Sequence, residues 1–210
     1  MRELTKTNFT GMWGSAGYRE KFEVYSRPDK GGVSEKAVVD KCLRPFLNKN
    51  HTCLEIGCGG GFWIDNYLSD GFKEVIGIDV VPITGTENRK SFRFIEVPDK
   101  DYSCYGVEDG SIDFVWSFGV FCHIRKDKIA EYVKSAHRVL KDGGMASLFF
   151  PCNDRRGSKS PSSEESTWES FSIKEAMLAM EDAGFTDIYD PIPSMRDLQL
   201  IGTKKGDNDE

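Results

Sequence analysis

Cys53-Leu54-Glu55-Ile56-Gly57-Cys58-Gly59-Gly60-Gly61 is the stretch that decides the fold of this chain. An apolar run leads into Glu55, and glycine then stands at every second position. Glycine in a turn after a strand lets the backbone approach a ligand closely. A second strand-like run, residues 75–78, follows and ends on Asp79. An acid at the end of the next strand can accept hydrogen bonds from ribose hydroxyls, so these residues predict a site for a nucleoside-containing cofactor.

The glycine spacing distinguishes between two classes of such cofactor. The dinucleotide fingerprint is G-x-G-x-x-G, whose third glycine packs a helix onto the strand. Gly57 and Gly59 fit its first two positions, but Phe62 stands at the third. The pattern present is acid-x-G-x-G-x-G, so NAD is not the expected ligand.

That pattern resembles the first motif of class I S-adenosylmethionine-dependent methyltransferases, and the resemblance covers about residues 50–150. Residues 111–117 resemble the family's fourth strand, residues 118–124 the loop after it as found among small-molecule methyltransferases, and residues 138–144 the turn into the fifth strand. The resemblance implies an α/β fold, a Rossmann-like doubly wound sheet of seven strands, mostly parallel, with an antiparallel C-terminal strand pair. It implies S-adenosyl-L-methionine as cofactor and S-adenosyl-L-homocysteine as product.

Length and composition predict one globular protein of the cytoplasm. The chain has 210 residues, 39% of them hydrophobic, and its net charge of −6 argues against broad binding to nucleic acid. No apolar run approaches the roughly 18 residues of a membrane helix, and the N-terminus lacks an apolar secretory core. Six scattered cysteines without C-x-x-C spacing indicate free thiols.

We expect three parts of the chain: a cap segment with the first helix at residues 1–48, packed on the same domain, a methyltransferase domain at 49–205, and a polar tail at 206–210. Strands are predicted at about 51–56, 74–79, 92–97, 112–117, 145–150, 186–189 and 198–203. Helices are predicted at about 34–45, 61–68, 127–140 and from the capping-box residues 172–175 to Gly184. Residues 80–91 leave little room for a helix, 98–110 are poorly helical, and 151–169 form the longest segment without periodicity.

The resemblance also assigns cofactor-binding residues. Those that hold the methionine part are Glu55, Gly57, Cys58, Gly59 and Gly61. Asp79 maps to the ribose-binding acid, and adenine is contacted just after the third strand, where Asp99 and Asp101 are both candidates. Ser117, Phe118 and Gly119 map to the end of the fourth strand, beside the transferred methyl group.

His123 follows that strand end, where it could act as a base, line the cofactor pocket or be a merely buried histidine. A neutral imidazole there could take a proton from an acceptor hydroxyl, which makes His123 the catalytic candidate. In relatives with this loop, the matching histidine often lines the cofactor pocket without acting as a base.

The residues that bind the acceptor must come from variable parts of the chain. Trp13, Tyr18 and Tyr25 in the N-terminal segment are candidates, with plain packing on the sheet edge as the alternative. Arg155 and Arg156, in the segment after the fifth strand, could pair with a phosphate or carboxylate, with a solvated loop as the alternative.

Missing motifs narrow the function further. Residues 117–120 read Ser-Phe-Gly-Val, without the Pro-Pro-aromatic motif of DNA amino-methyltransferases, so base flipping on DNA is not expected. Catechol-type relatives place an aspartate among their magnesium ligands where Ser117 stands, so we expect no metal. The expected activity is methylation of a small molecule, as O-methylation of a sugar-containing or natural-product-like acceptor. The alternatives are N-methylation of a small amine and a non-catalytic cofactor-binding or scaffold protein.

Overall fold

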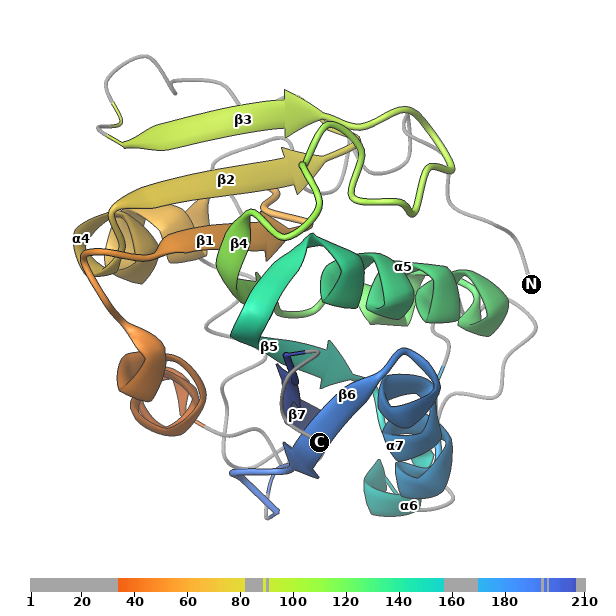
Figure 1. Ribbon diagram of the computed structural model, residues 1–210. Helices are drawn as coiled ribbons and strands as arrows, with labels where there is room; N and C mark the ends of the chain where they lie inside the picture. The colour runs from red at the N-terminus through yellow and green to blue at the C-terminus, as the bar shows by residue number, and fades with distance from the viewer. Residues whose placement is uncertain are drawn as a thin grey trace.

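The computed structural model describes residues 34–81, 89, 91–156, 170–193, 195 and 197–206. They form a seven-stranded sheet in the order β3-β2-β1-β4-β5-β7-β6 (Figure 1). The strands are β1 Thr52–Ile56, β2 Glu74–Asp79, β3 Phe92–Glu96, β4 Ile112–Ser117, β5 Leu140–Phe150, β6 Phe185–Tyr189 and β7 Leu198–Lys204. Strands β1 to β5 run parallel, and β7 is antiparallel to both β5 and β6. The predicted class I methyltransferase fold is confirmed.

The strand order places a crevice at one edge of the sheet. The chain runs outward from β1 through β2 to β3, and then returns to the other side of β1 to form β4. The connections that leave β1 and β4 therefore diverge at the carboxyl ends of these neighbouring strands. In open α/β sheets, ligands bind at this switch point.

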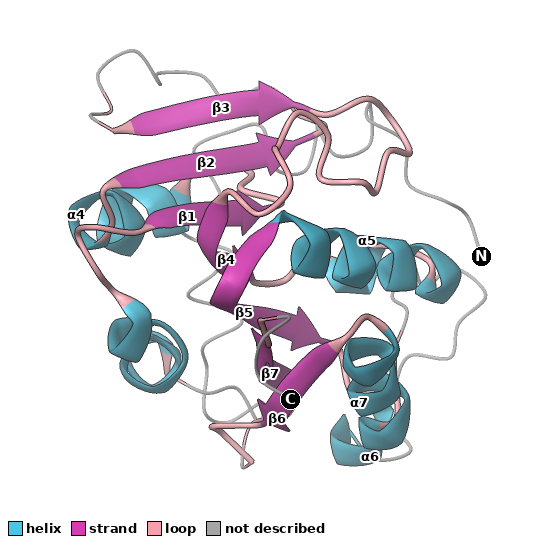
Figure 2. Cartoon of the chain, in the orientation of Figure 1, coloured by secondary structure: helices cyan, strands magenta, loops and turns pink. Residues whose placement is uncertain are grey.

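Both faces of the sheet are buried, which explains why its central strands are apolar along their whole length. Leu54 and Ile56 of β1 belong to a core shared with α5 (Lys126–Val139) and α7 (Ile173–Asp182). Cys53 belongs to a second core, shared with the helices around residues 35–46 and 62–71. Figure 2 shows α5 and α7 side by side.

Two helical runs begin at the capping serines that the sequence predicts, Ser34 and Ser172. Ser34 caps the first helical run, which consists of α3 Glu35–Val38, η2 Val39–Leu43 and η3 Arg44–Phe46. The glycine-rich residues 57–61 form a turn, called here the glycine turn. The helical run after it includes η4 Ile64–Leu68 and α4 Ser69–Gly71. The predicted capping box of α7 is formed: Ser172 Oγ accepts a bond from the Glu175 N–H, and the Glu175 carboxylate accepts one from the Ser172 N–H.

The structure differs from the expected elements in two places. Strand β5 begins at Leu140, directly after α5, because Leu140 already pairs with Ile112 of β4; the register then shifts, and the next paired residues are Met145 and Phe114. The segment after β5 starts with a short helix, α6 Asn153–Arg156, which is too short to produce a periodic pattern. Residues 98–110 are free of helix, as predicted. The expectation of a short helix between β2 and β3 falls largely on residues 82–88, outside the described part, as do residues 1–33 of the cap segment and residues 207–210 of the tail. Among the helices of the described residues, none has the length and apolar character needed to cross a membrane.

Candidate functional site

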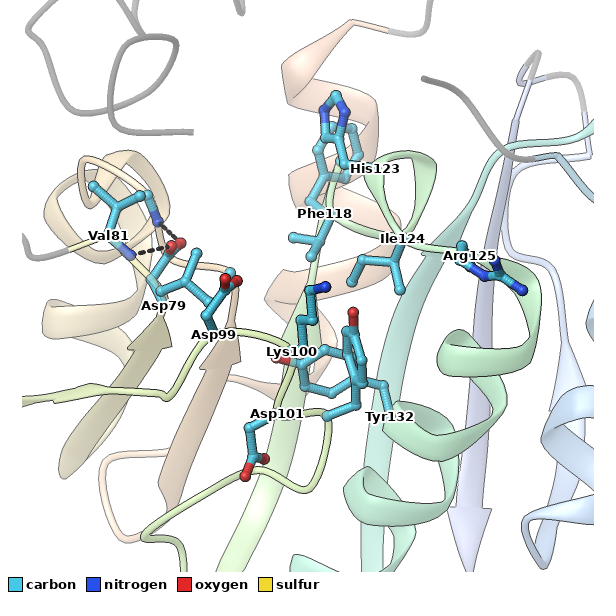
Figure 3. Close-up of a pocket in the computed structure, with 16 residues that line it drawn as sticks. Asp79, Val81, Asp99, Lys100, Asp101, Phe118, His123, Ile124, Arg125 and Tyr132 are labelled. Carbon is cyan, nitrogen blue, oxygen red and sulfur yellow. Dashed lines mark hydrogen bonds between the residues drawn. The ribbon is translucent and has the colours of Figure 1, made fainter. Parts of the chain in front are cut away.

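A pocket lies at the carboxyl ends of β1, β2 and β4, at the switch point of the sheet (Figure 3). Its lining comes from four loops and from α5. The residues that line it are Gly57, Gly59, Asp79, Val80, Val81, Asp99, Lys100, Asp101, Tyr102, Phe118, Gly119, Val120, His123, Ile124, Arg125 and Tyr132.

The glycine turn forms the floor of this pocket, and Gly57 can be only glycine for two reasons. Its φ of +70° lies in the left-handed region, and a Cβ atom there would lie 2.3 Å from Val120 Cγ2. The Gly57 N–H donates to the Ile78 carbonyl at 2.8 Å, which ties the turn to the end of β2. The turn is therefore shaped jointly by β2 and by the loop after β4.

Asp79 ends β2 and faces the turn. Its Oδ2 accepts a hydrogen bond from the Gly59 N–H at 2.8 Å, and its Oδ1 accepts one from the Val81 N–H at 3.0 Å. Burial raises the pKa of Asp79, although these backbone donors oppose the shift. A carboxylate offers about four acceptor positions, so two remain for a ligand.

Glu55 is buried beneath the turn, with 2% of its surface exposed. Its Oε2 has no hydrogen-bond partner among the described residues. Burial raises the pKa of Glu55 well above its usual value, the negative charge of Asp79 raises it further, and the positive charge of Arg89 opposes the rise. An unsatisfied acid is costly inside a protein, so this oxygen marks a place where a donor belongs.

Asp99 and Asp101 both line the pocket, and the structure distinguishes them. Asp101 Oδ1 accepts bonds from the N–H and the hydroxyl of Ser103, at 2.8 and 2.6 Å. In Figure 3 the Asp101 carboxylate points away from the pocket, whereas Asp99 points toward Asp79. Of the two, Asp99 has the orientation that suits a ligand contact.

His123 ends a 3-10 turn, η5 Phe121–His123, in the loop after β4. It lines the pocket on the side of Phe118, with the opposite side formed by Asp79 and Asp99 (Figure 3). Burial lowers the pKa of His123 to about 4. The imidazole is therefore neutral at physiological pH. Its conjugate acid is stronger than an ordinary imidazolium, so His123 is a weaker base than an ordinary histidine.

The three residues at the end of β4 have different environments. Phe118 and Gly119 line the pocket, and the Phe118 ring packs against Trp63 and Phe149. Ser117 is fully buried, and its carbonyl accepts a bond from the Gln199 side chain at 3.4 Å.

The structure thus brings eight of the predicted cofactor and catalytic residues to one pocket: Gly57, Gly59, Asp79, Asp99, Asp101, Phe118, Gly119 and His123. Glu55, Cys58, Gly61 and Ser117 are close in sequence to these residues but do not line the pocket. Cys58 is buried, and its sulfur packs against Gly77 of β2. Within the described ranges, no group of three or more His, Cys, Asp or Glu side chains has the arrangement of a metal site.

The predicted acceptor residues do not gather at this pocket in the described part of the chain. Trp13, Tyr18 and Tyr25, and the side chain of Arg156, lie outside the described residues. Arg155 is among the described residues, does not line this pocket, and makes its contacts within the protein. Its guanidinium pairs with Asp190 at 2.6 Å and donates to the carbonyls of Ile192, Met195 and Asp197 at 3.2–3.4 Å. Sequence alone could not reveal this, because those partners lie about 35–42 residues further along the chain.

Sequence reasoning missed several lining residues. Val80 and Val81 directly follow Asp79, so their position after the strand end was a usable signal. Tyr132 belongs to the buried face of α5, and its periodic position made it resemble an ordinary core residue. The other missed residues are Lys100, Tyr102, Val120, Ile124 and Arg125, which lie in loops without a distinguishing pattern.

Comparison with known proteins agrees with this geometry. Residues 54–148 match a family model described as a methyltransferase domain. A tRNA U34 carboxymethyltransferase from Aliarcobacter butzleri is 32% identical over 108 residues, a match that covers 49% of this chain and 34% of that protein. The cyclopropane mycolic acid synthase MmaA2 of Mycobacterium tuberculosis is 28% identical over 105 residues, or 49% of this chain and 37% of that protein. The chain thus spans about a third of the length of these curated relatives.

Solved structures show the same fold over nearly the whole chain. A chain of the Haloferax volcanii complex that contains the Trm112 methyltransferase activator has a TM-score of 0.70 and 18% identity, covering 98% of this chain and 100% of that one. The 1,6-didemethyltoxoflavin-N1-methyltransferase of Burkholderia thailandensis, solved with its namesake compound and S-adenosylhomocysteine, has a TM-score of 0.64 and 16% identity, covering 96% and 87%.

Proposed function

We propose that this chain is a class I S-adenosylmethionine-dependent methyltransferase, which transfers a methyl group from S-adenosyl-L-methionine to an acceptor and releases S-adenosyl-L-homocysteine. The observation that supports this most is the pocket at the switch point, where the Asp79 carboxylate and the glycine turn meet. Its remaining acceptor positions suit the two hydroxyls of a ribose.

The residues of the pocket fit the parts of this cofactor in order. Asp79 binds the ribose, and Val80, Val81 and Asp99 surround the adenine. The turn from Gly57 to Gly61 holds the methionine part, with the unsatisfied Glu55 oxygen beneath it. The reactive methyl group then lies near Phe118 and Gly119.

Methyl transfer from a sulfonium ion is an in-line displacement, so orientation supplies most of the catalysis. Phe118 and Tyr132 exclude water from one side of the pocket, and the glycine turn fixes the cofactor from the other. His123 stays neutral and can accept a hydrogen bond from the acceptor. Its low pKa limits how far it can accept a full proton.

The acceptor we favour is a small molecule with a hydroxyl group, such as a sugar-containing or natural-product-like compound. N-methylation of a small amine is the second candidate, and the lowered pKa of His123 favours it. A neutral amine has its own lone pair and needs less help from a base. A non-catalytic protein that only binds the cofactor is the alternative of another class.

Transfer RNA is a third possible acceptor, because curated relatives include enzymes named for tRNA. The expectation that nucleic acid is an unlikely partner, drawn from the net charge of −6, therefore lacks support from the comparisons. Assembly with a partner protein is likewise open to test, since a structure similar in fold is part of a complex with an activator.

Calorimetry tests the cofactor assignment. We expect the wild-type protein to bind S-adenosylhomocysteine and S-adenosylmethionine but not NAD. Asp79→Asn places an amide donor where two backbone donors converge, and it should weaken binding by about tenfold to a hundredfold. Asp70→Asn, on the exposed end of α4, is the matched control and should change nothing. Tight binding of NAD alone would contradict the proposal.

Transfer of a labelled methyl group separates the acceptors. The protein is incubated with labelled S-adenosylmethionine and, separately, with a small-molecule extract and with total tRNA. We expect label in the small-molecule fraction, and we expect it to survive EDTA. Label in tRNA alone would refute the small-molecule assignment, and loss of transfer in EDTA with recovery in magnesium would refute metal independence.

A further inference from the structure

Two side chains of opposite charge hold neighbouring residues of the glycine turn. Asp79 Oδ2 accepts the Gly59 N–H at 2.8 Å, and Arg89 Nη2 lies 3.4 Å from the Gly60 carbonyl, to which it donates. Asp79 is expected from the sequence, but Arg89 comes from the segment between β2 and β3 and belongs to no motif. The turn is therefore held by Asp79, at the carboxyl end of β2, and by Arg89, which follows β2 in the chain.

Arg89 is itself held rigidly. Its Nε and Nη2 bind the two oxygens of Asp65 at 2.7 and 2.9 Å, which is a bidentate ion pair. The Asp65 N–H in turn donates to the Gly61 carbonyl at 2.9 Å. Arg89 thus reaches the turn twice, directly at Gly60 and through Asp65 at Gly61.

The absence of a side chain at Gly61 makes room for this guanidinium. A Cβ atom on Gly61 would lie 2.7 Å from both Nη1 and Nη2 of Arg89. The Arg89 side chain is only 15% exposed and lies over the Phe92 ring, with 5.5 Å between Cζ and the ring centroid. Its Nη1 is buried without a hydrogen-bond partner among the described residues. Burying a hydrogen-bond donor without a partner costs free energy. We therefore expect Arg89 to make a contribution at the turn that compensates for this cost.

The charges around Glu55 give Arg89 a further effect. Three carboxyl groups lie near one another here, on Glu55, Asp65 and Asp79, and Arg89 is the cation that opposes the rise in the pKa of Glu55. Removing the guanidinium would raise the pKa of Glu55 further, because the positive charge that opposes the rise would be gone. The turn would then lose both its contact at Gly60 and its charge balance.

We propose that Arg89 is a positioning residue that fixes the Gly59–Gly61 turn against the amino-acid tail of the cofactor. The proposal rests on the proposed function, because it requires S-adenosylmethionine to lie across this turn. Arg89 acts through the backbone of the turn and through Asp65, whereas Asp79 holds the nucleoside end.

Comparing two ligands separates this role from a general loss of structure. S-adenosylhomocysteine carries the amino-acid tail, whereas 5′-methylthioadenosine keeps the nucleoside and the sulfur but lacks the tail. If Arg89 positions the turn for the tail, Arg89→Gln should weaken binding of S-adenosylhomocysteine by about tenfold or more and that of 5′-methylthioadenosine by less than about threefold. A role confined to overall stability would weaken both ligands equally.

The experiment is calorimetry with both ligands on the full chain, with folding checked by circular dichroism. Arg93→Gln is the matched control, because Arg93 lies on nearby β3, is about half exposed and has only a distant ion pair, 3.8 Å, with Glu74. It should leave both affinities unchanged. If Arg89→Gln fails to fold, Arg89→Lys keeps the positive charge but loses the bidentate fork, and it should show the same tail-selective loss at smaller size.

Each outcome has a definite meaning. Tail-selective loss in Arg89→Gln or Arg89→Lys supports the proposal. Equal loss for both ligands, or no loss for either, overturns it while leaving the proposed function intact. Failure of the wild-type protein to bind either ligand overturns the proposed function and this proposal with it.

Discussion

Asp79 shows how much a single side chain contributes to this site. Its position at the end of β2 predicts a ribose ligand, and the structure adds that its two oxygens accept hydrogen bonds from the N–H groups of Gly59 and Val81. The same carboxylate therefore shapes the turn and leaves acceptor positions for a ligand. A substitution at Asp79 tests both effects at once. Arg89 contacts the turn, Asp65 and Phe92 but does not line the pocket, so it gives the cleaner experiment on the tail.

His123 makes a prediction about pH. Its folded-state pKa is lowered to about 4, whereas the unfolded chain binds a proton near 6.5. Between these values the unfolded state binds more protons, so stability falls as the pH is lowered from 6.5 toward 4. His123→Gln removes this loss, which amounts to about 3 kcal/mol at the acid end.

Denaturant unfolding of both proteins between pH 4 and 8 measures the difference. The stability of His123→Gln relative to wild type should rise as the pH falls below 6.5. His51→Gln, just before β1, is the matched control. Parallel pH profiles for wild type and His123→Gln would show that His123 titrates normally.

At the scale of elements, the site depends on contact between two loops. Gly57 follows β1, and Val120 follows β4, and the Val120 side chain occupies the space that a side chain at residue 57 would need. Neighbouring parallel strands bring these loops together. The glycine requirement at residue 57 is therefore set partly by a residue on another strand connection.

Gly57→Ala should destabilise the protein by two separable effects. Gly59→Ala is the matched control, because Gly59 also has a positive φ, +48°, but no atom lies within 4 Å of its missing Cβ. We expect about 1–2 kcal/mol from the backbone in both variants and about 1–3 kcal/mol more in Gly57→Ala from the clash. Urea unfolding measures both, and Gly57→Ala/Val120→Ala should return toward the Gly59→Ala value. If the double variant recovers nothing, the clash with Val120 is not the cause.

At the scale of the whole molecule, Arg155 links the chain after β5 to the segment between the antiparallel strands β6 and β7. It lies on α6, after β5, and binds Asp190 and three carbonyls of the segment between β6 and β7. Both charged side chains are largely buried, with 17% and 14% exposed. This ion pair fixes the segment between β6 and β7 against the chain that follows β5.

Arg155→Gln should therefore lower the free energy of unfolding by about 3–5 kcal/mol, because it leaves the Asp190 charge buried without its partner. Arg44→Gln removes a more exposed helical pair with Asp40 and should cost less than about 1 kcal/mol. Urea unfolding measures both. Equal small losses would mean that Arg155 is not an anchor, and would return it to the acceptor-binding candidates.

The sequence by itself determined the class of fold and the centre of the site. Glycine spacing at residues 57–61, the acid at the end of β2 and the capping box of α7 are patterns within short segments, so they can be recognised along the chain. Strands that are apolar along their whole length are typical of a parallel sheet with both faces buried. The prediction of one site that includes Gly57, Gly59, Asp79 and His123 rests on these patterns, and the structure brings all four to one pocket.

Tertiary structure alone decided how the charged side chains are used. Arg155 could have faced an acceptor, but it meets Asp190; Arg89 had no assigned role, but it meets the glycine turn; and Asp99, rather than Asp101, points toward Asp79 (Figure 3). Each outcome depends on contacts between segments far apart in sequence or on the direction of one side chain in a loop. Neither kind of outcome produces a periodic pattern or a fixed spacing in the sequence, because the energy of such a contact depends on position in space and not on position along the chain.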